Sequence, residues 1–175
     1  MLKSKIKISD ITHLTDARYF AAWGVDYLTF NIDPESSTFV SPPVFKEIVE
    51  WVAGPSIVLQ APAHVEEIWL QEYKIEGIDN LLEMPADEEG VSYIFKDDTL
   101  VSVIIKGDLN QITESHISTY IDRGTEVYID APVTKDDLQS VADLGVGLVL
   151  RGGEEEQVGV KSYEDLDEIF DALMD

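Results

Sequence analysis

The sequence predicts an α/β protein built from repeated strand–helix units. Short apolar segments rich in Val, Ile and Leu alternate with longer segments of helical periodicity. Successive apolar segments begin about 20 to 30 residues apart, which is the length of a βαβ unit, so the strands are expected to be parallel. No linker or low-complexity tract interrupts the pattern, and we therefore expect a single domain over residues 1–175.

The strands are expected where β-branched and aromatic residues cluster between turn residues. They are Lys5–Ile11, Tyr27–Ile32, Ser56–Gln60, Ile78–Met84, Leu100–Lys106, Glu126–Asp130 and Gly147–Arg151. Helices are expected over Leu14–Trp23, Val44–Val52, His64–Tyr73, Gln111–Asp122, Lys135–Leu144 and Tyr163–Met174. One more apolar run, Ser92–Lys96, lies so close to the next strand that it is interpreted as a hairpin or an irregular insert.

Capping residues support the helix boundaries. Ser41 precedes Pro42, which suits the first helical position, and Thr134 stands three residues before Asp137 as in a capping box. Gly24 follows the first helix, where a left-handed residue ends helices. Both an open flavodoxin-like sheet and a (β/α)8-type barrel fit this order. A complete barrel needs about 200 to 250 residues, so a barrel here must be small or incomplete.

The composition narrows the classes of partner. The chain has 12 basic and 35 acidic residues, a net charge of −23, and no cysteine. Such a charge repels nucleic acid and anionic membranes, so neither is expected as a partner. The absence of cysteine excludes disulfides and thiol nucleophiles. The N-terminus begins with an alternating strand and has no signal-like apolar run, so we expect a cytoplasmic protein. The three histidines lack metal-like spacing and no cofactor-binding motif is present, so neither a metal nor a cofactor is expected.

Polar residues stand at the carboxyl ends of the predicted strands, where ligands bind in both architectures. They are Ser9 and Asp10, Asn31 and Asp33, Gln60, Glu83, Lys106, Asp130, and Arg151 with Gly152 and Gly153. Two of them are cations in a chain that is short of cations. The convergence of these strand ends favours one cavity at this end that binds a ligand, and the alternative is that the strands simply end where polar loops begin.

The first strand carries an unusual lysine. Alternation places Ile6 and Ile8 on one face, and Lys7 on the other. In a barrel Lys7 would point inward and would need a carboxylate partner, for which Glu83 and Asp130 are candidates. The alternative is that its ammonium reaches out at the bottom of the barrel.

The last strand runs into Gly152 and Gly153, beside Arg151. Glycines let backbone N–H groups approach a phosphate, and the helix that follows adds positive potential at its N-terminus. The acidic run Glu154–Glu156 opposes an anion at this place. A phosphate-binding loop and a simple turn both fit the pattern.

Two parts of the sequence resemble one known family. The start of the sequence resembles the start of the phosphoribosylanthranilate isomerases in three segments: Lys7–Thr12, Asp16–Arg18 and Ala21–Asp26. In that family the corresponding segments read Lys-Ile-Cys-Gly-Ile-Thr, then a helix that begins with acidic residues and Ala, then Gly-Ala-Asp. The end, Gly147–Glu154 and Gly159–Lys161, resembles the family's last strand and phosphate loop. About the first 60 and the last 40 residues are covered.

The resemblance implies a TIM-type barrel, incomplete or modified, with about seven clear βα units, and an Amadori rearrangement in tryptophan biosynthesis. Several family residues are replaced. The family's cysteine base corresponds to Ser9 and its neighbouring glycine to Asp10, while the substrate-binding arginine corresponds to Thr38. The family's general acid ends strand six and could be Asp130, unless Asp130 lies on strand seven.

Three functions are compatible with these residues. The first is a diverged, isomerase-like pseudoenzyme that keeps a phosphate pocket at Arg151–Gly153, with Lys7, Lys106 and Glu83 as further ligand contacts. The second is an active isomerase with Asp10 as base and Asp130 as acid. The third is another sugar-phosphate enzyme. The expected partner is a small phosphorylated metabolite, and the expected state is a monomer or homodimer.

Overall fold

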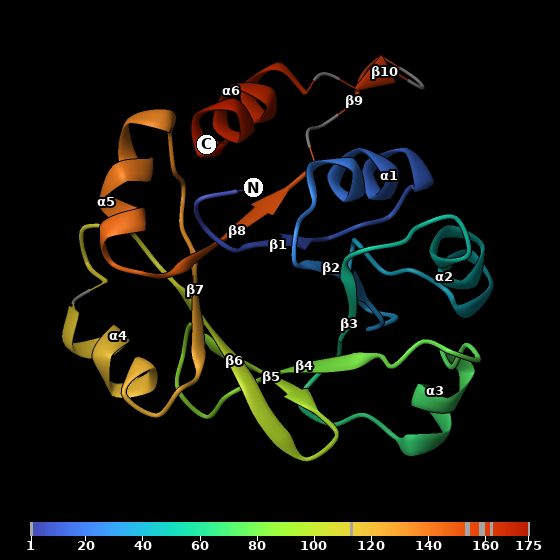
Figure 1. Ribbon diagram of the computed structural model, residues 1–175. Coiled ribbons are helices and arrows are strands. Elements are labelled where there is room, and N and C mark those ends of the chain that lie inside the picture. Colours follow the sequence, from blue (N-terminus) through green and yellow to red (C-terminus); the bar gives the residue numbers. More distant parts are fainter. Residues whose placement is uncertain (1, 113, 153–154, 158–159, 162, 175) are drawn as a thin grey trace.

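The computed structural model describes residues 2–112, 114–152, 155–157, 160–161 and 163–174, and its strands close into a barrel (Figure 1). The barrel strands are β1 (Ile6–Ser9), β2 (Tyr27–Asn31), β3 (Ser56–Gln60), β4 (Leu81–Pro85), β5 (Val91–Lys96), β6 (Thr99–Lys106), β7 (Glu126–Asp130) and β8 (Gly147–Arg151). The last strand pairs in parallel with the first, with Ser9 opposite Arg151. The barrel is thus confirmed, and the open flavodoxin-like sheet is wrong.

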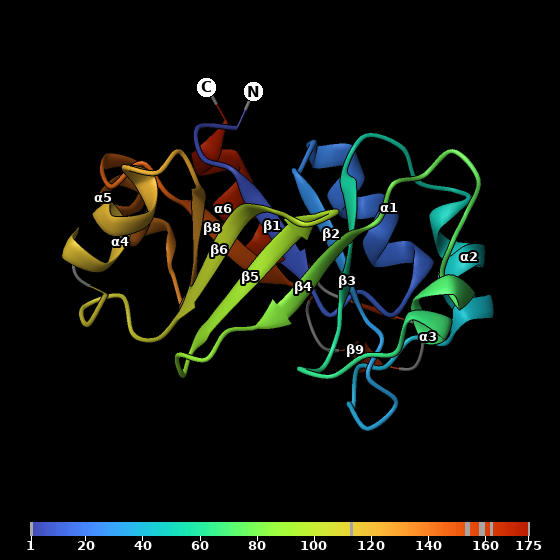
Figure 2. The ribbon, with the colours of Figure 1, turned by 90° about the horizontal axis from the view of Figure 1, so that it is seen from below.

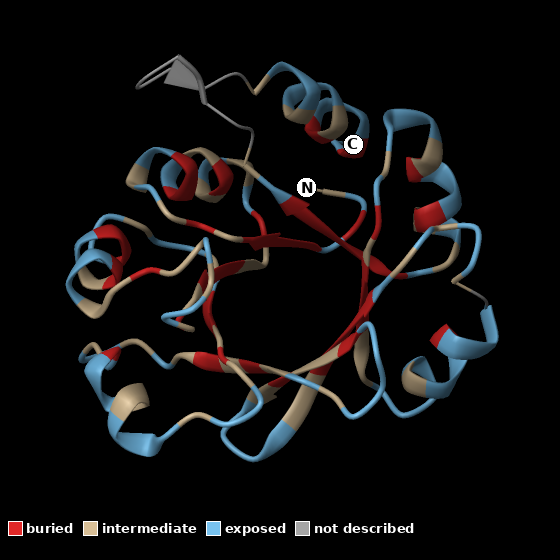
Figure 3. Ribbon diagram, turned by 180° about the vertical axis from the view of Figure 1, so that it is seen from behind, coloured by how far each residue is buried: buried red, intermediate tan, exposed pale blue. Residues whose placement is uncertain are grey.

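Helices cover the outside of the ring of strands except along β4 and β5 (Figures 1 and 3). They are α1 (Leu14–Trp23), α2 (Pro42–Val49), α3 (Glu67–Glu72), α4 (Glu114–Ile121), the short 3-10 helix η1 (Lys135–Asp137), α5 (Leu138–Asp143) and α6 (Glu164–Leu173). A small hairpin, β9 (Glu155–Gln157) and β10 (Val160–Lys161), precedes α6. The predicted caps are present: Gly24 ends α1 at φ 75°, and Thr134 and Asp137 form the capping box. No helix in the described ranges is long and apolar enough to cross a membrane.

The barrel departs from an all-parallel ring at its fifth strand, which corrects the expectation of parallel strands throughout. β5 runs antiparallel to both β4 and β6. The segment 81–106, described without a gap, contains no helix, because short turns with Gly90 at φ 76° and Asp97 at φ 52° reverse the chain. The predicted hairpin is therefore real, and it completes the ring instead of lying outside it. Figure 2 shows β4, β5 and β6 side by side with no helix across them.

Alternation along the strands produces two apolar layers. Residues such as Ile6, Ile8 and Phe30 face outward and pack beneath the helices in the main core. A smaller cluster fills the inside of the barrel: Val58, Leu81, Ile94, Ile104, Tyr128 and Val149. Figure 3 shows the buried residues concentrated in the strands and on the inner sides of the helices. The inner cluster makes the barrel a packed core and leaves ligand access to its carboxyl-end mouth.

Candidate functional site at the mouth of the barrel

A buried ion pair crosses the interior of the barrel. Lys7 Nζ lies 2.9 Å from a carboxylate oxygen of Glu83, and the two side chains are 1% and 4% exposed. The ammonium also donates to Ser9 Oγ at 2.6 Å, and Ser92 Oγ donates to Glu83 at 2.9 Å. Of the two alternatives for Lys7 the inward orientation is observed, and of its two candidate partners it pairs with Glu83. These hydrogen bonds compensate the cost of burying two charges.

Above this pair, Arg151 binds two carboxylates at the mouth. Its Nη1 and Nη2 donate to the two oxygens of Asp130 at 2.7 and 2.8 Å, and its Nε donates to Asp10 at 2.9 Å. Asp10 also accepts a hydrogen bond from Thr38 Oγ1 at 2.9 Å. Strand order explains the arrangement, because β8 lies between β7 and β1. The planar guanidinium thus binds Asp130 bidentately through Nη1 and Nη2, and it holds Asp10 through Nε.

The electrostatics of this cluster keep Asp130 and Arg151 charged. Burial acts to raise the pKa of Asp130, but the hydrogen bonds and charge of Arg151, with the charges of Lys106 and Lys7, lower it overall. The hydrogen bonds from Arg151 to Asp130 and Asp10 raise the pKa of the guanidinium. Asp130 is therefore a carboxylate at neutral pH.

This arrangement makes a pH-dependent prediction. Because the pKa of Asp130 is lower in the folded state, its stabilisation is complete above about pH 5 and is lost as the pH falls through the folded pKa. Arg151→Gln is expected to cost about 1–2 kcal/mol of unfolding free energy at pH 7, since the arginine is half-exposed, and clearly less near pH 3. Urea unfolding at both pH values measures this difference. A cost that does not change with pH would contradict the ion pair.

The remaining predicted residues lie at two heights in the barrel: at the mouth with Arg151, or in the layer below it with Lys7 and Glu83. Lys106 is exposed at the end of β6, and its backbone is in register with Asp130. Ser9 is 4% exposed and lies in the lower level with Lys7 and Glu83. The mouth level thus contains Asp10, Lys106, Asp130 and Arg151. The formal charges of these four residues balance, and Asp33, which lines a hollow beside Glu83, adds one further negative charge at the mouth.

The glycine loop has a structural requirement of its own. A Cβ on Gly152 would lie 2.7 Å from a carboxylate oxygen of Asp16, which is 2% exposed and accepts a hydrogen bond from Tyr163 Oη. Close packing on α1 therefore demands a glycine whether or not a phosphate binds. Gly153 lies outside the described residues. A phosphate role for either glycine stays a prediction.

Some contacts at the site were not predictable from residue type alone. Thr38 and Ser92 come from a loop and from the reversed strand, and they orient Asp10 and Glu83. Beside Glu83 the mouth holds a hollow of about 180 Å³, lined by Asn31, Asp33, Gln60, Ala61, Pro62, Glu83, Met84, Pro85 and Ser92. Among the described residues, no cluster of His, Asp and Glu side chains has the geometry to hold a metal ion.

We compared the sequence and the structure with those of known proteins. No family model matches the sequence, and no curated protein matches it. The structure, however, superimposes on phosphoribosyl anthranilate isomerase from Thermus thermophilus with a TM-score of 0.68, over 97% of this chain and 98% of that chain, at 21% sequence identity. The chain has the fold of the phosphoribosyl anthranilate isomerases.

Two further isomerase structures agree. The enzyme from Thermotoga maritima, in a monomeric form, gives a TM-score of 0.66 at 18% identity over 97% of this chain and 98% of that one. An isomerase in complex with reduced 1-(o-carboxyphenylamino)-1-deoxyribulose 5-phosphate gives 0.57 at 15% identity, with the same two coverages. Counted around this isomerase-type barrel, Lys106 ends the sixth strand and Asp130 the seventh.

Proposed function

We propose that the chain is a diverged member of the phosphoribosylanthranilate isomerase family. In this proposal the mouth of the barrel binds a phosphate-bearing, sugar-like ligand, and the isomerase activity is weakened or lost. Support comes from the shared fold over nearly the whole chain and from the similar isomerase that holds a ribulose 5-phosphate derivative. The segments that resemble the family, at both ends of the sequence, point the same way.

The observation that carries the loss of activity is the binding of both mouth carboxylates by Arg151. A general acid must hold a proton near the working pH, whereas the lowered pKa of Asp130 keeps it ionised. A general base needs a free lone pair directed at the substrate, whereas Asp10 already accepts from Arg151 and Thr38. Neither carboxylate is therefore prepared for proton transfer.

The residues at the family's catalytic positions support the same conclusion. Ser9, in place of the cysteine, is buried and accepts a hydrogen bond from the Lys7 ammonium, which makes its hydroxyl a poor base. The sixth strand, where the family has its acid, ends in Lys106. Thr38, in place of the substrate-binding arginine, is bonded to Asp10. Each general acid or base typically contributes about 10²- to 10⁴-fold, so their combined loss leaves little turnover.

The cations explain why a phosphate-bearing ligand is still favoured. Arg151 and Lys106 lie on neighbouring sides of Asp130 at the mouth, in a chain with few basic residues. A guanidinium that binds a carboxylate bidentately offers the same two donors to a phosphate. A phosphate would therefore compete with Asp10 and Asp130 for Arg151.

That competition predicts how binding responds to substitution. Inorganic phosphate and ribose 5-phosphate are expected to raise the melting temperature of the wild-type protein, and ribose is not. Asp10→Asn should strengthen phosphate binding about tenfold, since one competing charge is removed, and Arg151→Gln should abolish the shift. Arg123→Gln, at an exposed arginine beyond α4, is the matched control. A shift that survives in Arg151→Gln would contradict the proposed site.

A further inference from the structure

The outer face of β4 and β5 lacks the helices that cover the other strands. In a (β/α)8 barrel, a crossover helix follows each strand and covers the outer surface of the ring. Here antiparallel turns join β4 to β5 and β5 to β6, and the described segment 81–106 contains no helix. Figure 2 shows this stretch between α3 on one side and α4 on the other. Two helix positions are thus left empty.

The side chains on this face are apolar. Two cross-strand pairs lie on it, Leu82 with Phe95 and Met84 with Tyr93. They point outward, because Glu83 and Ile94, which alternate with them, face the interior. All four are half-buried, and the rings of Tyr93 and Phe95 contact each other edge to face. We call these four residues the open face.

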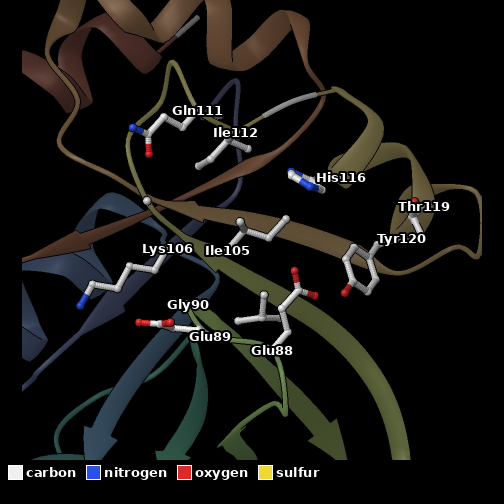
Figure 4. Close-up of a pocket in the computed structure, with 12 residues that line it drawn as sticks. Glu88, Glu89, Gly90, Ile105, Lys106, Gln111, Ile112, His116, Thr119 and Tyr120 are labelled. Carbon is white, nitrogen blue, oxygen red and sulfur yellow. The ribbon is translucent and has the colours of Figure 1, made fainter.

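A hollow lies on each side of the open face. One, of about 770 Å³, lies towards α3 and is lined by Leu82 and Phe95 together with Leu70, Ile75, Glu76, Asp97 and Asp98, among others. The other, of about 320 Å³, lies against α4 and includes Glu88, Ile105, His116 and Tyr120 (Figure 4). Figure 4 shows the Glu88 carboxylate directed towards Tyr120 and the Lys106 side chain extending away from both. The hollows therefore continue the apolar strip where helices would pack.

Charge around the strip indicates what could occupy it. The turn before β5 carries Glu88 and Glu89, the turn after it carries Asp97 and Asp98, and all four are exposed. A second copy of the chain would bring another net charge of −23 against this rim, which disfavours self-association. Three lysines, Lys74, Lys96 and Lys106, also stand at this rim, but the carboxylates outnumber them. A helix with an apolar stripe and basic flanks therefore matches both the strip and its rim.

We propose that the open face and its two hollows form a docking surface for an amphipathic helix with basic flanks, supplied by a partner protein. The helix would occupy the space of the absent crossover helices, with its apolar stripe on Leu82, Met84, Tyr93 and Phe95. The open face is on the outside of the barrel, away from Asp10, Asp130 and Arg151, and Lys106 is the residue that the hollow against α4 shares with the mouth.

The test uses the whole chain and a fluorescein-labelled synthetic helix, with leucines spaced three and four residues apart and lysines elsewhere. Fluorescence anisotropy at about 150 mM salt, which screens unspecific charge attraction, should show saturable binding. Phe95→Glu should weaken it at least about tenfold, although the added charge would by itself attract the peptide. Trp51→Glu, which adds the same charge at an aromatic residue that is 69% exposed and lies just after α2, is the matched control.

Two double variants at exposed residues test the same surface without relying on Phe95→Glu, which alters a half-buried residue and could fail to fold. Glu76→Lys with Asp98→Lys reverses two exposed charges at the rim, and Glu47→Lys with Glu50→Lys makes the same change on α2. Only the first pair should weaken binding. The proposal is overturned by equal effects of both pairs, by no saturable binding, or by a concentration-dependent dimer that Phe95→Glu dissociates, because a second copy would then be the occupant.

Discussion

Replacing Lys7 by Met is expected to lower the unfolding free energy by about 3–5 kcal/mol, because it leaves a buried charge without its partner. Glu83 is 3% exposed and would retain only the hydrogen bond from Ser92. Methionine has nearly the length of lysine and is apolar, so the loss reports the missing charge rather than a cavity. Urea unfolding followed by tryptophan fluorescence measures it.

The double variant Lys7→Met with Glu83→Leu separates pairing from packing. It is expected to recover most of the loss, since a buried ion pair replaced by apolar residues of similar volume is often neutral or stabilising. Lys135→Met is the control, because the Lys135–Glu168 pair is 58% and 64% exposed and should contribute less than about 1 kcal/mol. If the single Lys7 variant is as stable as the wild type, the buried pair does not form in solution.

Gly147→Ala is expected to destabilise the barrel by about 1–3 kcal/mol through overpacking. A Cβ at Gly147 would lie 2.5 Å from a ring carbon of Tyr128 and 2.9 Å from the backbone carbonyl oxygen of Lys5. The tyrosine is fully buried, and the carbonyl belongs to the backbone beside β1, so neither moves easily. Thermal and urea unfolding should both report the loss.

A matched glycine distinguishes this steric effect from the general effect of alanine. Gly107, at the end of β6, has ordinary backbone geometry, and its nearest neighbour to a Cβ is Ile112 at 3.9 Å. Gly107→Ala should therefore be neutral or slightly stabilising, since it restricts the unfolded chain. Equal losses for the two variants would contradict the packing of Tyr128 against Gly147.

Local sequence patterns predicted much of this fold. β3, β7, β8 and α1 begin and end at the predicted residues, because each is a well-defined apolar run or amphipathic segment between turn residues. Predicted and observed bounds differ for β4, where Ile78 instead pairs locally with Ile75. Asp79 and Asn80, two residues typical of turns, separate Ile78 from Leu81, and the barrel strand begins directly after them.

The closure of the ring by β5 could not be predicted from local sequence patterns. A short strand next to a turn predicts a hairpin, but its membership of the barrel depends on pairing with two other strands. No helix was predicted between Met84 and Gln111, and the described segment 81–106 contains none. Chain length indicated a modified barrel, and the structure shows the modification in the reversed strand β5 and in the absence of helices beside it.

At the site, the convergence of polar strand ends was predictable and their pairing was not. Parallel strands bring their carboxyl ends to one mouth, so Lys106, Asp130 and Arg151 had to lie near one another. Arg151 binds both Asp130 and Asp10 because β8 lies between β7 and β1 and because the backbone of Asp10 is left-handed, at φ 59°. The seventh-strand position of Asp130 likewise required the count of strands around the closed ring.

The most direct test of the proposed function is to incubate the purified protein with phosphoribosylanthranilate and follow the decay of its fluorescence. We expect decay at the uncatalysed rate, since Arg151 occupies both mouth carboxylates and Ser9 is a poor base. Decay faster than the uncatalysed rate that is abolished by Asp10→Asn or Asp130→Asn would contradict this account. The chain would then be an active isomerase in which Asp10 or Asp130 transfers the proton.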